Sequence, residues 1–258
     1  MQSLLFLGEI LHELPPDTIK RLLDDPGSPA AEFVTLNGTG LIGNTARLFD
    51  VFEKLFDNGI DVITLGESAL SRPASRELLD RFPRIIRPLN VSPHSPGKGN
   101  IFLKCDSLSF WMIALAMPTD RRPLDDPFHV IEAWLDGPGR DLPGFVHLLG
   151  EDRAMKQALV WRYRRSQPPI HWLGTGLGAA SRRVFVREGT LFVPDIGVIG
   201  AEGNIAGMAP ERWWKRYRER LHTESLPPIT RITAEGVLLR LESSFKIDSV
   251  ESILLPPQ

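Results

Sequence analysis

Short apolar runs that end in glycine recur along this chain and constrain its fold more than any other feature. The fullest example is Ile170–Leu173, which is followed by the glycine-rich turn 174–178 and then by a second apolar run, Leu191–Val193, that ends at Pro194-Asp195. This pattern is typical of α/β proteins, in which small residues after a buried strand let a ligand approach the backbone. The turn itself offers almost no chemical groups, so the stretch indicates a fold more clearly than an activity.

Strand and helix signals alternate along the chain, with hairpins inserted. The expected strands are Ser3–Leu7, Phe33–Leu36, Val62–Leu65, Arg84–Arg87, Ile101–Lys104, Phe110–Leu115, Gly144–Leu149, Ile170–Leu173, Val184–Val186, Leu191–Val193 and two or three within Ile229–Leu255. The expected helices are Thr18–Leu23, one from Asn44 or Thr45 to Gly59, one from Ser71 to Phe82, Phe128–Leu135, Glu151–Arg165 and one that begins at Pro210. This order predicts one α/β domain over residues 1–258, with a mixed sheet system and a β-rich C-terminal segment.

Composition excludes several classes of protein. The formal net charge of −2 gives no whole-chain argument for binding nucleic acid or a membrane surface. The one cysteine, Cys105, leaves no intrachain disulfide and suits a reducing compartment. The N-terminus has no basic region before its apolar run, and no apolar run approaches the roughly 18 residues that span a bilayer. We therefore expect a soluble, cytoplasmic protein.

A dinucleotide site is the most tempting motif. Residues 174–179 fit G-x-G-x-x-A after a strand, and Asp195 lies where a ribose-binding acid would be expected. However, a helix has to follow such glycines, whereas Arg182–Gly189 reads as a strand and a hairpin turn. The sequence therefore disfavours a dinucleotide-binding fold.

Histidines, tryptophans and paired acids all favour structural roles. No two of the six histidines have metal-ligand spacing, and His147 and His171 lie inside apolar strands, where a packed histidine is expected. Asp125 and Asp126 precede a helix and are expected to cap it. The aromatic residues of the helix after Pro210 have helical spacing, which favours core packing; they are Trp213, Trp214 and Tyr217.

Three carboxylates remain as candidate chemistry. Glu9 and Glu67 each follow a glycine at the end of an expected strand, and Asp195 closes another. Together they could bind a hard cation such as Mg²⁺ or Mn²⁺ through oxygen. The alternative is an internal salt-bridge cluster, because carboxylates at such a short distance from one another need a positively charged partner. Nearby candidates for that partner are Arg47, Arg72, Arg182 and Arg183.

Taken together, the motifs resemble the YmdB-like branch of the calcineurin-like metallophosphoesterases over nearly the whole chain. The motifs that carry the resemblance are, in order, Leu7-Gly8-Glu9-Ile10, Asn37-Gly38-Thr39-Gly40, Val62-Ile63-Thr64-Leu65-Gly66, Arg87-Pro88-Leu89-Asn90, Pro96-Gly97-Lys98-Gly99, Pro123-Leu124-Asp125-Asp126-Pro127-Phe128, Gly174-Thr175 and Asp195-Ile196-Gly197. The resemblance implies a four-layer α/β/β/α sandwich of two mixed sheets. It also implies two bound metal ions and hydrolysis of phosphodiesters, including cyclic nucleotides.

The departures from the family pattern fall where the resemblance places the metal ligands. Aspartate, glutamate, asparagine and histidine positions of the family are replaced in this sequence at Glu9, Thr39, Gly40, Glu67, Ser68, Leu149, Gly176 and Gly178. Without two metals there is no low-pKa bridging hydroxide and no clamp on the transition state. Since Glu9 and Glu67 keep negative charge at this place, we expect a cationic side chain to accompany them.

These observations leave three hypotheses. The first is a metal-free, catalytically inactive relative that serves as a binding, regulatory or assembly scaffold, with an unknown protein partner or a second copy of itself. The second is a phosphodiesterase with a rebuilt carboxylate site of Glu9, Glu67 and Asp195 that uses Mg²⁺ or Mn²⁺. The third is a module that binds a nucleotide or phosphate without hydrolysing it.

Overall fold

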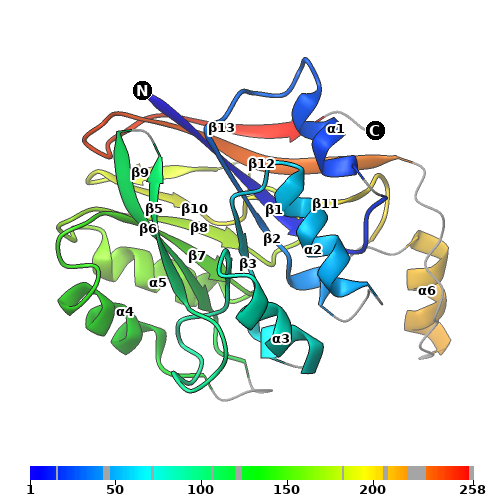
Figure 1. The fold of residues 1–258 in the computed structure, drawn as a ribbon, viewed down its shortest axis with the longest axis horizontal. Coiled ribbons are helices and arrows are strands. Elements are labelled where there is room, and N and C mark those ends of the chain that lie inside the picture. The colour runs from blue at the N-terminus through cyan, green and yellow to red at the C-terminus, as the bar shows by residue number, and fades with distance from the viewer. Residues whose placement is uncertain are drawn as a thin grey trace.

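A computed structural model shows two mixed β-sheets packed face to face, with helices on the outside (Figure 1). The structure describes residues 1–15, 17–42, 47–70, 73–105, 107–119, 124–181, 183–205, 209–219 and 231–255, with side chains omitted at 68, 69 and 216. This arrangement confirms the expected α/β sandwich of two mixed sheets.

The first sheet has seven strands in the order β13-β12-β11-β1-β2-β3-β4. The central strand β1 pairs in parallel with β2 and β11, and antiparallel with β12. The strands are β1 (Gln2–Ile10), β2 (Phe33–Asn37), β3 (Val62–Thr64), β4 (Ile85–Ile86), β11 (Val198–Ala201), β12 (Ile232–Leu241) and β13 (Ile247–Leu255).

The second sheet has six strands in the order β5-β6-β7-β8-β10-β9. Its middle strands run parallel, and each edge is an antiparallel hairpin, as expected from the sequence. The strands are β5 (Asn100–Cys105), β6 (Leu108–Ala116), β7 (Gly144–Leu149), β8 (Ile170–Thr175), β9 (Phe185–Arg187) and β10 (Thr190–Val193).

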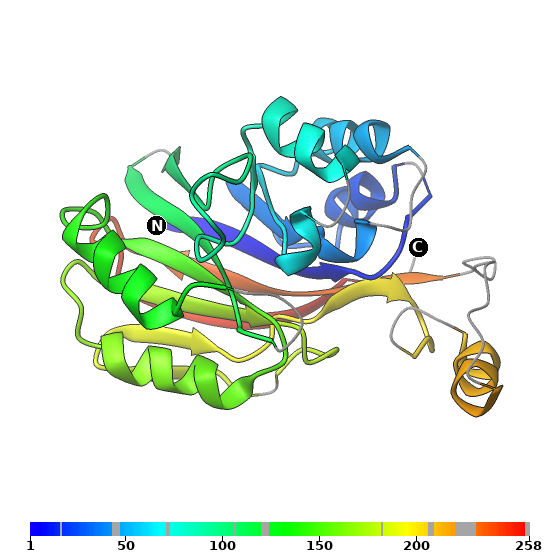
Figure 2. The ribbon, with the colours of Figure 1, turned by 90° about the horizontal axis from the view of Figure 1, so that it is seen from below.

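Helices cover both outer faces (Figure 2). Three helices pack on the first sheet and two on the second, and an aromatic-rich core that includes Phe6, Phe110 and Phe145 fills the space between the sheets. Asp126 accepts a hydrogen bond from Phe128 N at the start of its helix, which confirms the expected cap. The helices are α1 (Thr18–Asp24), α2 (Leu48–Asp57) and α3 (Pro73–Arg81) on the first sheet, and α4 (Pro127–Asp136) and α5 (Arg153–Tyr163) on the second.

Two elements differ from expectation. Strand β11 was not expected, because its four residues lie in a glycine-rich segment that reads as a turn. Helix α6 (Pro210–Glu219) stands apart from the layers (Figures 1 and 2), and Trp214 and Tyr217 are exposed rather than packed in the core. These rings stack instead on neighbouring rings of their own helix, Trp213 and Tyr217 at a centroid distance of 5.5 Å.

Among the described residues, no helix combines the length and apolarity that crossing a membrane requires.

Candidate active-site cleft

A cleft of about 640 Å³ lies where strands of both sheets end. It is reached by the C-terminal ends of β1, β2 and β3 from the first sheet and of β6, β7 and β8 from the second. Crevices at such strand ends are the usual ligand sites of α/β folds. The lining residues are Glu9, Asn37, Thr39, Gly66, Glu67, Ala116, Met117, Pro118, Thr119, Leu149, Gly150, Glu151, Asp152 and Gly176.

The polar side chains at the end of β2 bond to one another and to the protein. The Asn37 amide nitrogen donates to Thr175 Oγ1 at 2.9 Å, which joins the two sheets. The Asn37 carbonyl oxygen accepts from the backbone nitrogen and the hydroxyl of Thr39. The same Thr39 hydroxyl accepts from Gly66 N at 2.7 Å. Because this network satisfies its own donors and acceptors, it leaves little capacity to hold a metal ion.

Asp195 has a structural role at this end of the fold. Its side chain is fully buried, and its two carboxylate oxygens accept from Gly197 N at 2.7 Å and Leu177 N at 2.5 Å. Burial raises the pKa of Asp195, while these two backbone donors and the nearby Lys156 oppose the rise. Asp195 therefore fixes the loop that follows β8 and does not line the cleft.

Lys156 supplies the cationic side chain that the sequence led us to expect. It lies in the first turn of α5, is fully buried, and donates to Thr175 O at the end of β8 at 2.7 Å. Burial lowers its pKa to about 8, against the attraction of Asp195 and, more weakly, of Glu9. Of the arginines proposed for this role, Arg47 lines a separate cavity and Arg183 is exposed, while the predictions for Arg72 and Arg182 lie outside the described residues.

Glu9 is the carboxylate of the cleft with the most unusual environment. It lies near the end of β1, is partly buried, and its side chain makes no hydrogen bond to the part of the chain that the structure describes. Burial first, and the charge of Asp195 second, raise its pKa to about 7, although Lys156 acts in the opposite direction. The protonated form of Glu9 is therefore populated at much higher pH than for an ordinary glutamate.

Glycines occupy positions where no larger side chain fits. A Cβ at Gly40 would lie 2.1 Å from Ile10 O, and one at Gly176 would lie 2.7 Å from Gly150 O, with Gly176 at φ +108°. Gly178 has φ +85° but open space around it. The backbone at Gly40 and Gly176 is therefore shaped for glycine, so the difference from the family pattern involves the main chain as well as the missing side chains.

The donor set does not fit the two metal ions that the resemblance implies. Thr39 is engaged in the network above, Gly40, Leu149, Gly176 and Gly178 offer no side-chain donor, and the side chain of Ser68 lies outside the described part. Within the described residues there is no group of three or more His, Cys, Asp or Glu side chains that could hold a metal ion.

The three carboxylates proposed as a cation site have different surroundings. Glu9 and Glu67 line the same cleft, and Glu67 accepts a hydrogen bond from Thr119 at 3.0 Å. Asp195 is absent from the cleft lining, and both of its oxygens accept from backbone nitrogens, although its charge still helps to raise the pKa of Glu9. The carboxylates that line the cleft with Glu9 are Glu67, Glu151 and Asp152. A cation site formed by Glu9, Glu67 and Asp195 stays a prediction.

Two expectations about motifs are confirmed. The glycine turn after β8 leads into the β9–β10 hairpin, and residues 176–181 and 183–184 form no helix that a dinucleotide fold would need. His147 and His171 are packed inside the fold. His147 Nδ1 bonds to Thr64 Oγ1 at 2.8 Å, and His171 bonds to Phe245 O at 3.1 Å and to Leu191 N at 3.2 Å.

Neither the buried Lys156 nor the hydrogen bond between Asn37 and Thr175 was predicted from the sequence. One signal for Lys156 was present: it shares a helical stripe with Leu159 and Tyr163, and a lysine on an otherwise buried stripe needs an acceptor or a counter-charge. No signal in the sequence shows that Asn37 meets Thr175, because 138 residues separate them.

Comparison with known proteins places the chain in a family. Residues 5–253 match the family model described as YmdB-like protein. A 2',3'-cyclic-nucleotide 2'-phosphodiesterase of Bacillus subtilis (strain 168) is 24% identical over 255 residues, which cover 98% of this chain and 96% of that protein.

Solved structures agree with the fold. A hypothetical protein from Thermus thermophilus superimposes with a TM-score of 0.81 at 22% identity, covering 99% of this chain and 100% of that chain. A structure described as a novel phosphatase from Mycoplasma pneumoniae gives a TM-score of 0.83 at 18% identity, covering 100% and 95%. A putative 5'-nucleotidase from Staphylococcus aureus gives 0.59 at 13% identity and matches over 54% of its own length. With nearly all of its length matched by one family model, the chain belongs to the YmdB-like protein family.

Proposed function

We propose that this chain is a YmdB-like protein that does not hydrolyse phosphodiesters by two-metal catalysis and acts as a binding or assembly scaffold. The observation that carries the proposal is that the polar side chains at the strand ends are already bound to other groups of the protein. Asn37, Thr39 and Asp195 are bound to protein groups, and Lys156 provides a built-in positive charge where a metal centre would neutralise carboxylates.

The charge of the cleft supports the same proposal. The described lining contains four acids, Glu9, Glu67, Glu151 and Asp152, and no lysine or arginine. A phosphodiester is an anion, so without bound cations such a surface repels it. The acidic lining argues against the third hypothesis, in which the cleft holds a nucleotide through its phosphate. A cytoplasmic location and a homo-oligomer remain predictions.

The test combines metal content, turnover and ligand binding. Purified protein is equilibrated with Mn²⁺ or Mg²⁺, its bound metal is measured by elemental analysis, and hydrolysis of a 2',3'-cyclic nucleotide is assayed beside the Bacillus subtilis relative as a positive control. We expect less than one tightly bound metal ion per chain, no turnover above background, and no thermal stabilisation by the cyclic nucleotide.

The other two hypotheses predict different outcomes. Stoichiometric metal together with turnover that is lost in Glu9→Gln would support a rebuilt metal site and refute the proposal. Thermal stabilisation by the cyclic nucleotide without turnover would support a nucleotide-binding module. The matched control is Glu151→Gln, which removes one exposed carboxylate from the rim of the same cleft.

A further inference from the structure

A second hollow, remote in sequence from the cleft residues of β1–β3, lies between α5 and the β9–β10 hairpin. Its volume is about 500 Å³. Three large apolar side chains in its lining are exposed, Trp161 by 64%, Phe185 by 42% and Val186 by 57%. Phe185 stacks on Phe192, which forms the buried floor, at a centroid distance of 6.2 Å. Exposed apolar side chains gathered in one hollow mark a contact surface rather than chance exposure.

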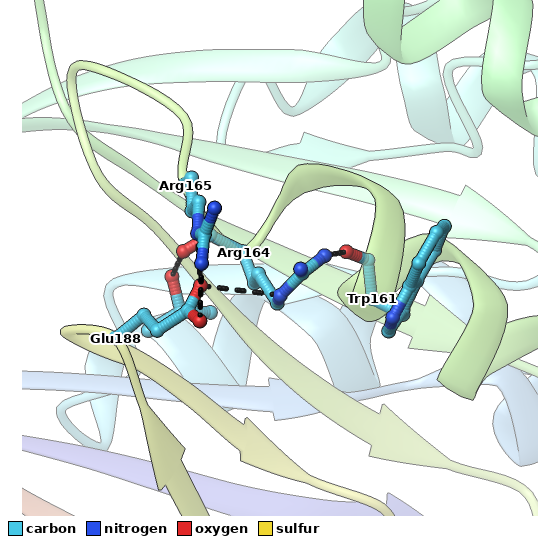
Figure 3. A network of polar contacts seen from close by, with 5 residues as sticks. Trp161, Arg164, Arg165 and Glu188 are labelled. Carbon is cyan, nitrogen blue, oxygen red and sulfur yellow. Dashed lines mark hydrogen bonds and ion pairs between the residues drawn. The ribbon is translucent and has the colours of Figure 1, made fainter.

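An ion-pair network holds the two walls of this groove together (Figure 3). Glu188, at the hairpin turn, binds Arg165 Nε at 2.6 Å and Arg164 Nε at 3.1 Å. The Arg164 guanidinium lies 4.9 Å from the Trp161 ring centre and also donates to Trp161 O, and Thr190 Oγ1 donates to Arg164 O. The groove is thus formed before any ligand arrives, which lowers the entropic cost of binding.

One side of the groove is an open sheet edge. Strand β9 is the last strand of its sheet and pairs only with β10. Arg187 lies opposite Thr190 across the two-residue turn at 188–189, where both residues have positive φ. In this register Val186 is a non-hydrogen-bonded position, so its N–H and C=O point outward. Neither group has a partner among the described residues, which makes this edge a template for an added strand.

The charge of the residues around the groove indicates whether a second copy of this chain or a different protein pairs with β9. The described lining of the groove contains Arg164 and Arg187 and no acid, and Arg183 is exposed just before β9. If two copies paired through β9, Arg183 and Arg187 of both chains would meet, while Glu188 is already engaged by Arg164 and Arg165. Like charges across paired strands are destabilising, so the edge favours an occupant that carries acidic residues.

We propose that the groove binds an extended, acidic and apolar peptide segment of a partner protein by adding a strand to β9. Alternate side chains of the segment lie over Trp161, Phe185 and Phe192, and a carboxylate meets Arg187. Because β9 has three residues, backbone pairing sets the register and the apolar groove supplies most of the affinity. The inference is independent of catalysis and stands whether or not the cleft is active.

The test is a selection from a displayed library of random peptides, about twelve residues long, on the wild-type protein. We expect the enriched peptides to alternate apolar and acidic residues. Synthetic copies of these peptides should bind the Trp161→Ala and Arg187→Glu variants at least about tenfold more weakly than the wild-type protein, because Trp161 is the apolar anchor and Arg187 the charge partner. Trp214→Ala removes another exposed tryptophan, on α6, and should leave binding unchanged. N-methylation of alternate peptide residues should abolish binding, since it removes backbone donors.

Several results would overturn the proposal. They are a failure to enrich any peptide, enriched peptides without acidic residues, and binding that Trp161→Ala and Arg187→Glu leave intact while both variants keep the wild-type circular dichroism spectrum. A concentration-dependent dimer that Arg187→Glu alters and that competes with the peptides would assign the groove to a second copy instead.

Discussion

Replacing Glu9 with glutamine tests whether this carboxylate is held without a metal ion. The raised pKa means that the folded protein binds the Glu9 proton more tightly than the unfolded chain does. The stabilising contribution of that proton is complete below about pH 4.5 and is lost as the pH rises through about 7. Glutamine resembles the protonated acid at every pH, so Glu9→Gln escapes the loss. The variant should therefore be the more stable protein in alkaline solution.

The magnitude follows from the shift in pKa. Each pKa unit between the folded and unfolded states is worth about 1.4 kcal/mol, so the rise from 4.5 to about 7 corresponds to about 3 kcal/mol. The pKa of about 7 already contains the attraction of Lys156, and the remaining contact of Glu9 with solvent reduces the expected gain to about 2 kcal/mol. At about pH 5 the wild-type carboxyl is protonated in the folded state, so the difference between the two proteins should fall below about 1 kcal/mol.

The assay is urea unfolding followed by tryptophan fluorescence at several pH values between about 5 and 8, with EDTA present to remove metal ions. The control Glu151→Gln changes an exposed carboxylate of the same cleft and should stay within about 0.5 kcal/mol of wild type throughout. A stability difference that does not change with pH would refute the reasoning. So would a Glu9→Gln protein that is less stable than wild type at about pH 8, because that result would mean that the charged carboxylate has a stabilising partner.

Four further substitutions test the same site. Lys156→Met should lower the free energy of unfolding by about 3 kcal/mol, measured by urea titration, because it leaves Thr175 O and the buried carboxylates without their cation; an unchanged midpoint would contradict this role. Gly176→His should lower the free energy of unfolding by at least about 2 kcal/mol, and the variant should bind no Mn²⁺. Gly178→His, at a positive φ but in open space, should lower it less. Equal melting temperatures of the two variants would contradict the steric argument. Asp152→Ala should lower the free energy of unfolding by about 1 kcal/mol, because the Asp152 side chain caps α5 by accepting from Met155 N at 2.9 Å. An unchanged melting temperature would show that water replaces the cap.

The sequence carries most of the fold because local patterns and short connections determine it. Apolar runs followed by glycine predict the parallel strands, and the two hairpins at the edges of the second sheet follow from their short turns. Strand β11 could not be found this way, since Val198 and Ile199 alone make too short an apolar run. The helix after Pro210 was predicted correctly, but the burial of its aromatic side chains was not. Helical spacing of aromatic residues does not show whether another element packs against them.

The candidate site depends on contacts between distant parts of the chain, and those contacts are not written in local patterns. Missing imidazoles at Gly176 and Gly178 are visible in the sequence, as is the absence of a donor at Leu149. Whether Glu9 and Asp195 share a ligand depends on the direction of each side chain, and the two backbone donors of Asp195 come from a loop whose course no motif predicts. The sequence therefore predicts which groups are absent better than it predicts how those that remain are paired.

Charge balance explains why the surviving acids of this cleft can be tolerated. Two divalent cations would neutralise several carboxylates at once, whereas Lys156 brings a single positive charge to both Glu9 and Asp195. Asp195 is compensated further by two backbone donors, whereas burial first, and the charge of Asp195 second, raise the pKa of Glu9 to about 7. On the proposed function, a cleft that is neutralised this incompletely does not attract a phosphodiester anion. Under the proposed function, restoring one ligand, for example by a histidine at Gly178, is not expected to restore substrate binding while the balance of charge stays negative.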